Sequence, residues 1–539
     1  MKPSVTQVKD HTLQSSATTM NVAERVYEQI TVTDLNRMVK LEHVQAIQES
    51  ELVYKSEPFD SIPGPKSLRY LSKFWSIFPV VSMHATARTI KYLLNTGSQL
   101  VSSRSSWFLS KMFHQYGPVV RLHTPFGGDV VVVNRAEHVR EVFINEGRYP
   151  MQSCLDCLEQ YRKYKQECPV PMYGVEYEKL PIGIEEMFNT SNLSNFEMLK
   201  DICDEFVTRI LGIRNRQLEV PSYFQDEIQK WSLECLISAA VNKRMGFLDS
   251  ASLDSTSKPS QLLQAVEKAT TAIRRCESGI HLWRFFNTPT WYSLVQNCDV
   301  LGSILSTYIC ETQDSLQRKK DESENLSLVE TLFVKEGLSP EDVLTVLFDM
   351  ILVGVNALSH SVTFLMYNFS QNPRTQQKLY DEIKQLRATN MSDVSNIKYL
   401  KACIQESFRL NPPMPILSRV LSKDISLDNY LIPKGTNVLV ATHMCSRREE
   451  HFDDAHLFRP GRWLEDNLLN SEYNTITMPF GYVANSCLAL NLVEVQIATL
   501  FVKLIQKFKI EYHYGEIRSK HHIMSEPNRP LKFRFVERN

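Results

Sequence analysis

The sequence predicts a mainly α-helical protein with a small β region. Three observations support this fold class: a long uncharged helical pattern near residue 350, helical periodicity from about residue 195 to 317, and two short apolar runs typical of a hairpin. The chain has 539 residues, 43% of them hydrophobic and 22% charged. It is therefore too apolar to be wholly disordered and long enough to bury a large core.

Charge and cysteine content narrow the class of protein. Lysine and arginine total 60 against 61 acidic residues. The near-zero net charge provides no overall positive potential to attract nucleic acid, so we expect no nucleic-acid partner. The 11 cysteines are odd in number and no secretory signal precedes them, which favours free thiols in a reducing compartment. Cys154 and Cys157 form a lone C-x-x-C that lacks a second pair of metal ligands. We therefore expect buried thiols there.

The domain organisation is predicted from turn signals and composition. Residues 1–55 are predicted to be an N-terminal extension and a candidate targeting segment, although they lack Arg before Arg25 and contain acids, which mitochondrial presequences avoid. Ile62-Pro63-Gly64-Pro65 is a rigid, helix-free hinge. Since no repeat or long linker follows, we predict one folded domain over residues 56–539.

The first elements of that domain follow from local pattern. Residues 119–123 and 129–133 read as the two strands of a hairpin, with Pro and Gly residues between them. The helical periodicity from 195 to 317 is interrupted by polar residues at 249–260 and by 287–289.

The longest predicted helix begins after Ser339. Ser339 is an N-cap, Pro340 occupies the first helical position, and Asn372-Pro373 ends the helix. About 30 residues give roughly 45 Å, enough to cross a domain. Because polar side chains lie in its middle, we expect a buried central helix and no membrane span. His360 on this helix is expected to be a core histidine with satisfied hydrogen bonds rather than a proton relay.

Three patterns in the last third carry chemistry. Glu406 and Arg409 lie three residues apart on a predicted helix over 401–410, where a carboxylate and a guanidinium pair. Arg462 follows in an aromatic, proline-containing segment, 458–463. Cys487 then stands in a glycine-containing loop directly before an apolar helix over 488–508. A thiolate at such a helix N-terminus is stabilised by backbone N–H groups and suits an axial metal ligand.

In this order and spacing, the patterns resemble the haem-thiolate monooxygenases, the cytochromes P450. The resemblance runs from about Ile62 to the C-terminus. It implies the cytochrome P450 fold, with haem b held between the long central helix and the helix that follows the ligand cysteine. It implies that Cys487 ligates the iron and that Glu406, Arg409 and Arg462 form a structural triad. Asp349-Met350, with no N-terminal anchor evident, resembles the animal mitochondrial branch.

The same resemblance assigns the remaining haem contacts, with departures. It places Phe480, Gly481 and Asn485 in the ligand loop, where the family has Arg at the position of Asn485 and Gly at those of Val483 and Ala489. An Arg would neutralise a haem propionate, and a Val resists backbone angles that Gly permits. Tyr177 stands where an earlier helix of the family carries Trp, and Pro181 replaces its Arg. Arg419 matches a further propionate-binding Arg and is retained.

The resemblance also locates the catalytic positions. Asn356 and Ala357 occupy the places of the family's acid and alcohol beside the oxygen site. Neither side chain titrates near neutrality, so general acid catalysis from this pair is lost, which leaves ordered water, a substrate hydroxyl or Ser359 as the proton source. For docking of an acidic ferredoxin, Lys401 is retained, whereas Gln405 and Leu490-Asn491 replace basic residues and weaken the electrostatic match.

Three functional hypotheses remain open at this point. The first is a monooxygenase that inserts one oxygen atom from O2 into a small apolar substrate, sterol-like or xenobiotic, with electrons from a ferredoxin. It would lie at the matrix side of the mitochondrial inner membrane, with peripheral membrane contact only. The second is a haem-thiolate isomerase or lyase that rearranges a peroxide, motivated by the lost acid–alcohol pair. The third is a catalytically impaired binding protein on the same fold.

Overall fold

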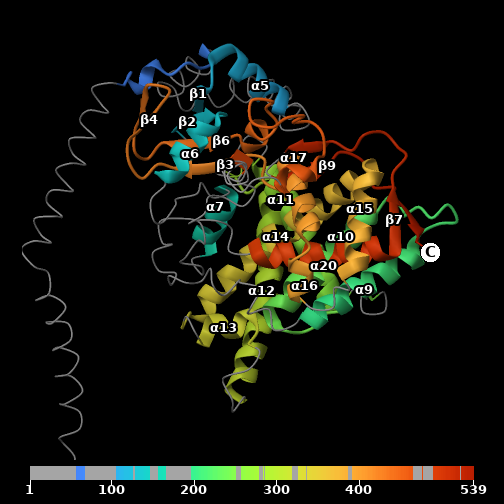
Figure 1. Cartoon of the computed structure of the whole chain (residues 1–539). Coiled ribbons are helices and arrows are strands. Elements are labelled where there is room, and N and C mark those ends of the chain that lie inside the picture. Colours follow the sequence, from blue (N-terminus) through green and yellow to red (C-terminus); the bar gives the residue numbers. More distant parts are fainter. Residues whose placement is uncertain are drawn as a thin grey trace, which may run out of the picture. The chain divides into compact units, whose positions relative to one another are not determined.

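The computed structural model is shown in Figure 1. It describes residues 56–66, 105–124, 128–145, 156–165, 196–249, 256–277, 283, 286–318, 326–334, 337–386, 391–464, 476–477, 490–521 and 524–538. Two compact units are distinguished: residues 1–61 with 424–432, and residues 62–423 with 433–539. The predicted boundary between residues 55 and 56 stays a prediction, because residues 1–55 lie outside the described residues.

In the first unit, a tight hairpin is the main feature. Strand β4 (Ile425–Leu427) pairs antiparallel with β5 (Tyr430–Ile432). The two turn residues Asp428 and Asn429 have φ of 53° and 66°, the left-handed conformation that a two-residue hairpin turn requires. The short 3-10 helix η1 spans Phe59–Ser61. Just before it, Glu57 accepts a hydrogen bond from Leu431 N at 2.9 Å.

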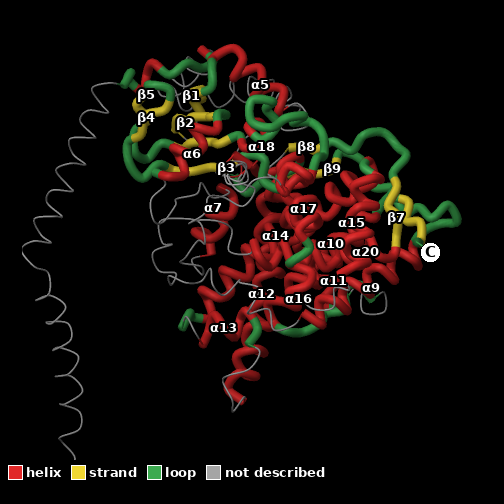
Figure 2. Tube along the Cα trace, in the orientation of Figure 1, coloured by secondary structure: helices red, strands yellow, loops and turns green. Residues whose placement is uncertain are grey.

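The second unit is dominated by helices, which confirms the predicted mainly α class (Figure 2). Its helices are α5 (Ser105–Tyr116), α6 (Ala136–Ile144), α7 (Asp156–Lys165), α9 (Phe196–Ile213), α10 (Phe224–Val241), α11 (Lys258–Glu277), α12 (Pro289–Arg318), α13 (Leu328–Val334), α14 (Pro340–Gln371), α15 (Pro373–Leu386), α16 (Met391–Ser395), α17 (Lys398–Leu410), α18 (Thr442–Cys445), the 3-10 helix η5 (Pro460–Leu464) and α20 (Leu490–Lys507).

The predicted long helix is α14, and its predicted ends are confirmed. Ser339 Oγ accepts from Asp342 N at 3.2 Å, Pro340 is the first helical residue, and Asn372 is the C-cap. Helices α10, α11, α12 and α17 all pack against it. Among the described residues, α14 is the one helix long and apolar enough to span a membrane, but most of it is buried inside the fold. Its apolar character is therefore that of a core helix.

A four-stranded sheet has the order β1-β2-β6-β3. The predicted hairpin is confirmed as β1 (Val119–Thr124) and β2 (Gly128–Val133), and β2 runs parallel to β6 (Asn437–Val440), which pairs antiparallel with β3 (Leu417–Val420). The hinge packs on this sheet, since Arg121 N donates to Pro63 O at 2.9 Å. A Cβ on Gly64 would lie 2.0 Å from Arg121 O, so only glycine permits this approach.

The chain between α9 and α10 departs from the helical pattern predicted for 195–317. Leu218 has φ of 64°, Pro221 follows, and Val220 N donates to Phe533 O at 2.9 Å. The break is thus fixed by pairing with the C-terminal segment, a tertiary contact that local periodicity does not report. That segment carries β7 (Phe508–Glu511), β8 (Ser519–His521), β9 (Ser525–Pro527) and β10 (Arg534–Glu537), with β7 paired to β10 and β8 to β9.

Candidate functional site

A buried cluster of one carboxylate and two guanidinium groups joins α17 to η5. Arg409 donates from Nε and Nη2 to the two carboxylate oxygens of Glu406, each at 2.9 Å. Arg462 Nε donates to Glu406 Oε1 at 3.2 Å, and Glu406 and Arg409 are both 0% exposed. The pairing predicted from the i, i+3 spacing is confirmed, and its burial makes it a structural cluster rather than a solvated surface pair.

Further hydrogen bonds of this cluster bind distant backbone. Arg409 Nη1 donates to Ser446 O and Ala455 O, each at 2.7 Å. Trp463 Nε1 donates to Glu406 Oε2 at 2.8 Å. Arg459 N, in the loop before η5, donates to Glu406 Oε1 at 2.9 Å. Because one carboxylate accepts from α17, this loop and η5 at once, the cluster fixes the residues after α18 against α17.

The middle of α14 has one incompletely buried face. Val353, Gly354 and Ala357 are only partly buried, although the helix around them is almost entirely buried. Their spacing of one, three and four residues places them on one side of the helix. All three carry small or no side chains. A Cβ on Gly354 would lie 3.2 Å from Leu236 Cδ1 on α10, so the backbone packs closely there, whereas Val353 and Ala357 keep part of their surface exposed.

Asn356, the position predicted to replace the family's acid, is held by two neighbouring helices. Its Nδ2 donates to Thr270 Oγ1 on α11 at 3.0 Å, and its Oδ1 accepts from Gln229 Nε2 on α10 at 3.1 Å. The side chain is 5% exposed. Its amide is thus engaged at both ends, about 100° around the helix from Ala357.

A polar chain continues from there along α14. Ser359 Oγ donates to Asn356 O at 3.1 Å and accepts from Gln225 Nε2 at 3.3 Å. Thr363 Oγ1 lies 2.9 Å from Gln225 Oε1. Sequence reasoning missed Gln225, Gln229 and Thr270, although two glutamines four residues apart on an apolar helix are a usable signal.

His360 lies in the same stretch of α14 and is buried. Burial lowers its pKa to about 4, so the ring is neutral near pH 7. Among the described residues its Nδ1 has no hydrogen-bond partner. The expectation of a fully satisfied core histidine is therefore wrong for that atom, because a neutral ring can remain unpaired in a core where a charged one cannot.

Arg419 is the predicted propionate contact that the structure describes. It lies on β3, is 3% exposed, and its guanidinium carbon stands 4.7 Å from the ring centre of Phe143 on α6. Nη1 donates to Ser418 O at 2.9 Å. A buried guanidinium needs anionic or carbonyl partners, which suits the role predicted for it.

The other predicted cofactor contacts lie outside the described residues. These are Cys487, Tyr177, Phe480, Gly481 and Asn485, and their roles stay predictions. Of the described cysteines, Cys403 and Cys445 are both fully buried. Burial raises the pKa of the Cys445 thiol to about 12, so this thiol stays protonated and is a poor metal ligand.

Comparison with known proteins decides the family. The sequence profile of the cytochrome P450 family matches residues 90–535. The chain belongs to the cytochrome P450 family. Its haem cofactor and its class, a cytochrome P450 monooxygenase, are thereby confirmed at the level of the family.

Several P450 relatives are similar over most of the chain. "Probable cytochrome P450 301a1, mitochondrial" of Drosophila melanogaster is 26% identical over 508 residues, covering 89% of this chain and 87% of that protein. "Cytochrome P450 CYP12A2" of Musca domestica is 27% identical over 455 residues, covering 78% and 84%. "Ecdysone 20-monooxygenase" of D. melanogaster is 24% identical over 514 residues, covering 92% of each chain.

The described residues fit the haem of a cytochrome P450. Val353 and Ala357 stay partly exposed on an otherwise buried helix, and a flat porphyrin can cover such small apolar side chains. Arg419 supplies a buried cation of the kind that a propionate requires. Both features are thus consistent with the haem cofactor that the family implies.

Proposed function

We propose that this cytochrome P450 is a mitochondrial monooxygenase that oxidises a small apolar, sterol-like or xenobiotic substrate with electrons from a ferredoxin. The observation that carries the proposal is the small, apolar, partly open face of α14 at Val353, Gly354 and Ala357. Relatives named as mitochondrial support the compartment, and we place the protein at the matrix side of the inner membrane.

The haem is proposed to be held by this chain's Cys487, Arg419, Tyr177 and the ligand loop with Phe480, Gly481 and Asn485. When bound through a thiolate, haem iron supplies the activation of O2 for insertion of one oxygen atom. Arg419 would neutralise a propionate. Asn485 contributes no charge, so this protein is expected to hold the propionates less firmly than an Arg-containing loop does.

The described residues offer no proton donor of the usual kind on the open face. Ala357 has no titratable group, and the Asn356 amide is bound to Gln229 and Thr270. The Ser359 hydroxyl already donates to Asn356 O. We therefore propose that protons arrive through ordered water or a substrate hydroxyl on the face at Val353, Gly354 and Ala357.

Electron donation is assigned to a basic surface formed by Arg374 and Lys378 of α15 and Lys398 and Lys401 of α17. All four side chains are exposed, and α15 contacts α17. Complementary charge steers an acidic partner to such a surface. The surface thus supports a ferredoxin as the electron donor.

The deciding experiment is a spectrum of the purified, reduced full chain with carbon monoxide. We expect the Soret position of thiolate-ligated haem, and its loss in Cys487→Ala, with Cys403→Ala as the matched control that retains it. Absence of that band from the wild type would overturn the haem-thiolate assignment. With the band present, turnover that is indifferent to ferredoxin would overturn the electron donor alone.

A second candidate function is favoured by the engaged Asn356 amide. Rearrangement of a peroxide by a haem-thiolate isomerase or lyase needs neither external protons nor a reductase. Conversion of a lipid hydroperoxide by the holoprotein without any reductant would establish this function. Strict dependence of all turnover on ferredoxin would exclude it.

A further inference from the structure

Two thiols from different helices lie next to each other inside the fold. Cys157 is in the first turn of α7, and Cys276 is in the last turn of α11. Their side chains are 0% and 1% exposed, and both are free cysteines. The two thiols form a hydrogen bond with each other. The fold therefore holds a buried pair of reduced cysteines that the proposed haem chemistry does not use.

Hydrogen bonds to the backbone fix the position of both cysteines. Cys157 N donates to Glu277 Oε1 at 2.8 Å, which joins the start of α7 to the residue directly after Cys276. Trp283 Nε1 donates to Cys276 O at 3.2 Å, and its ring stacks on Trp291 of α12 with ring centres 5.2 Å apart. The proximity of the thiols thus rests on backbone contacts as well as on their own hydrogen bond.

A disulfide between the two cysteines requires little movement. The sulfur atoms of a disulfide are about 2.05 Å apart and its Cα atoms about 4.4–6.8 Å apart. Helices α7 and α11 already pack against each other, and the hydrogen-bonded thiols are already neighbours. Closing the bond therefore needs a local adjustment at the first turn of α7, and the helices keep their arrangement.

The two thiols differ in reactivity. The hydrogen bond from the Cys157 thiol lowers the pKa of Cys276, although burial and the charge of Glu277 oppose this shift. The same hydrogen bond, together with burial, raises the pKa of Cys157. Because the thiolate is the nucleophile, Cys276 is the cysteine that attacks an oxidant, and Cys157 is the one that attacks the oxidised sulfur.

A third buried thiol provides a matched control. Cys298 lies on α12, which packs against α11, and its side chain is 0% exposed. Burial raises its pKa, so this thiol stays protonated. In the described part of the chain, no hydrogen bond joins it to Cys157 or Cys276. Cys298 therefore matches the pair in residue type and burial but not in pairing.

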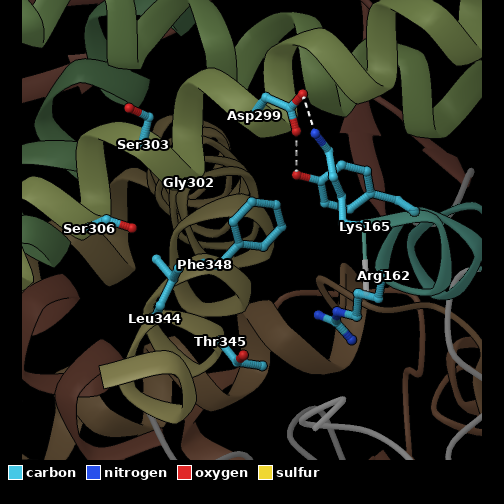
Figure 3. Close-up of a pocket in the computed structure, with 10 residues that line it drawn as sticks. Arg162, Lys165, Asp299, Gly302, Ser303, Ser306, Leu344, Thr345 and Phe348 are labelled. Atoms are coloured by element: carbon cyan, nitrogen blue, oxygen red, sulfur yellow. Dashed lines mark hydrogen bonds and ion pairs between the residues drawn. The ribbon is translucent and has the colours of Figure 1, made fainter. Parts of the chain in front are cut away.

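Further along α7, polar contacts tie the helix to α12 and α14. Lys165 Nζ lies 2.8 Å from Asp299 Oδ2, and Tyr161 Oη donates to Asp299 Oδ1 at 2.9 Å, as the dashed lines in Figure 3 show. Arg162 forms an ion pair with Asp349 of α14. The pair at Lys165 is partly exposed, and such pairs stabilise little. A covalent bond at Cys157 would restrain the opposite end of the helix much more strongly.

We propose that Cys157 and Cys276 form a reversible, peroxide-sensitive disulfide that ties α7 to α11. The Cys276 thiolate attacks one oxygen of hydrogen peroxide, the O–O bond breaks, and the released hydroxide takes up a proton to become water. The Cys157 sulfur then attacks the sulfenic acid on Cys276, the S–O bond breaks, and the hydroxyl leaves with the Cys157 proton as a second water. The two thiols together lose two electrons to the peroxide. A small dithiol reverses the bond by thiol–disulfide exchange.

Hydrogen peroxide suits the site because of its size and charge. Both sulfur atoms are buried, so an oxidant has to pass between packed side chains, and a charged oxidant would also lose its hydration. A small neutral peroxide loses far less. The pair is therefore expected to respond to peroxide while bulky or charged thiol reagents react only with accessible cysteines such as the exposed Cys310.

Peptide mass mapping of the full chain, in the form isolated from the expressing cell, tests the pairing. The reduced protein is treated with hydrogen peroxide, free thiols are alkylated, and the protein is digested without reductant. We expect a linked peptide that contains Cys157 and Cys276, is two hydrogen atoms lighter than the sum of its parts, and separates on addition of a dithiol. Absence of a linked peptide, or a link from either cysteine to a different one, would overturn the proposal.

Single substitutions separate the roles of the two thiols. In Cys157→Ser, peroxide is expected to leave Cys276 as a sulfenic acid that dimedone traps. In Cys276→Ser, no sulfenic acid is expected on Cys157, because its thiol stays protonated. The matched change Cys298→Ser should leave the disulfide unchanged. Trapping on Cys157 instead of Cys276 would overturn the assigned roles, and loss of the disulfide in Cys298→Ser would overturn the pairing.

Hydrogen exchange of the wild type needs no substitution and tests the restraint of α7. The reduced and oxidised forms are compared over residues 156–165, with α15, which carries neither cysteine, as the control segment. A disulfide restricts opening of the helix that it ties down, so we expect the amides of α7 to exchange at least about tenfold more slowly in the oxidised form. Unchanged exchange in α7, or equal slowing in α15, would overturn this restraint.

Discussion

At the scale of single residues, the strongest interactions of this P450 are buried and shared. The Glu406 carboxylate accepts from Arg409, Arg462 and Trp463 at 2.8–3.2 Å with no solvent access. Each partner alone would carry a large desolvation cost, and each is stable because the others are present. The sequence predicted the pair but not its burial, since i, i+3 spacing is equally common on exposed helices.

Removal of Arg409 is expected to destabilise the fold strongly. Arg409→Met leaves Glu406 buried with fewer donors, and breaking such a buried pair costs about 3–5 kcal/mol. The matched control is Arg448→Met. Arg448 pairs at 3.0 Å with Glu450, whose side chain is 67% exposed, so losing this pair should cost at most about 1 kcal/mol. Urea unfolding of both variants measures the difference. Equal losses would contradict a structural role for the cluster.

His360 predicts a pH dependence of stability. Its folded pKa is about 4 against 6.5 for the free side chain, because burial disfavours the charged ring; the neighbouring Glu526 raises this pKa and Arg274 lowers it. Below pH 6.5 the unfolded chain takes up a proton that the folded chain takes up only near pH 4. The free energy of unfolding is therefore highest above pH 6.5 and decreases as the pH falls. At pH 5 it is lower by about 2 kcal/mol than at neutral pH.

The variant His360→Met removes this titration while keeping an apolar side chain of similar size. Unfolding free energies at pH 7.5 and pH 5 are compared for the two proteins. We expect the variant to lose about 2 kcal/mol less than the wild type over that interval. Parallel losses in both would show that His360 is not excluded from protonation in the folded state.

At the scale of elements, the ends of α14 could be predicted from the sequence, whereas its tertiary contacts could not. Its start at Ser339 and Pro340 and its end at Asn372 were predictable, because caps and proline act locally. The partners of Asn356 were not, because Gln229 and Thr270 lie 127 and 86 residues away along the chain. Likewise, the hydrogen bond from Val220 N to Phe533 O between α9 and α10 joins residues far apart in the sequence, which no local pattern reveals.

Restoring an alcohol on α14 is expected to raise activity. Ala357 is partly buried on the open face, so a threonine fits there and supplies the hydroxyl that the family pattern carries. General acid–base groups contribute about 10²–10⁴-fold, and we expect Ala357→Thr to raise product formed per electron consumed by about tenfold or more. Product and reductant consumption are measured together, with Ala239→Thr on α10 as control. An unchanged ratio would mean that protons already arrive efficiently by another path.

At the scale of the whole molecule, the second unit is organised by aromatic contacts among distant segments. Phe369 of α14 lies 5.5 Å from Phe501 of α20 and 6.2 Å from Phe458, measured between ring centres. Helix α20 and the segment before η5 are thus packed on the central helix. Composition predicted a large core of this kind, whereas the particular pairs follow only from the tertiary arrangement.

Truncation of Phe369 is the corresponding prediction. Its side chain is 0% exposed, so Phe369→Ala removes a whole ring from a packed core and is expected to cost about 3–5 kcal/mol. Because α14 and α20 flank the proposed haem position, haem retention should fall together with stability in the variant. The control Phe286→Ala removes the same ring from a site that is 59% exposed, where the cost should stay within about 0.5 kcal/mol. Thermal unfolding and haem content are followed on the same samples, and a Phe369→Ala protein that melts like the control would refute a core shared by α14 and α20.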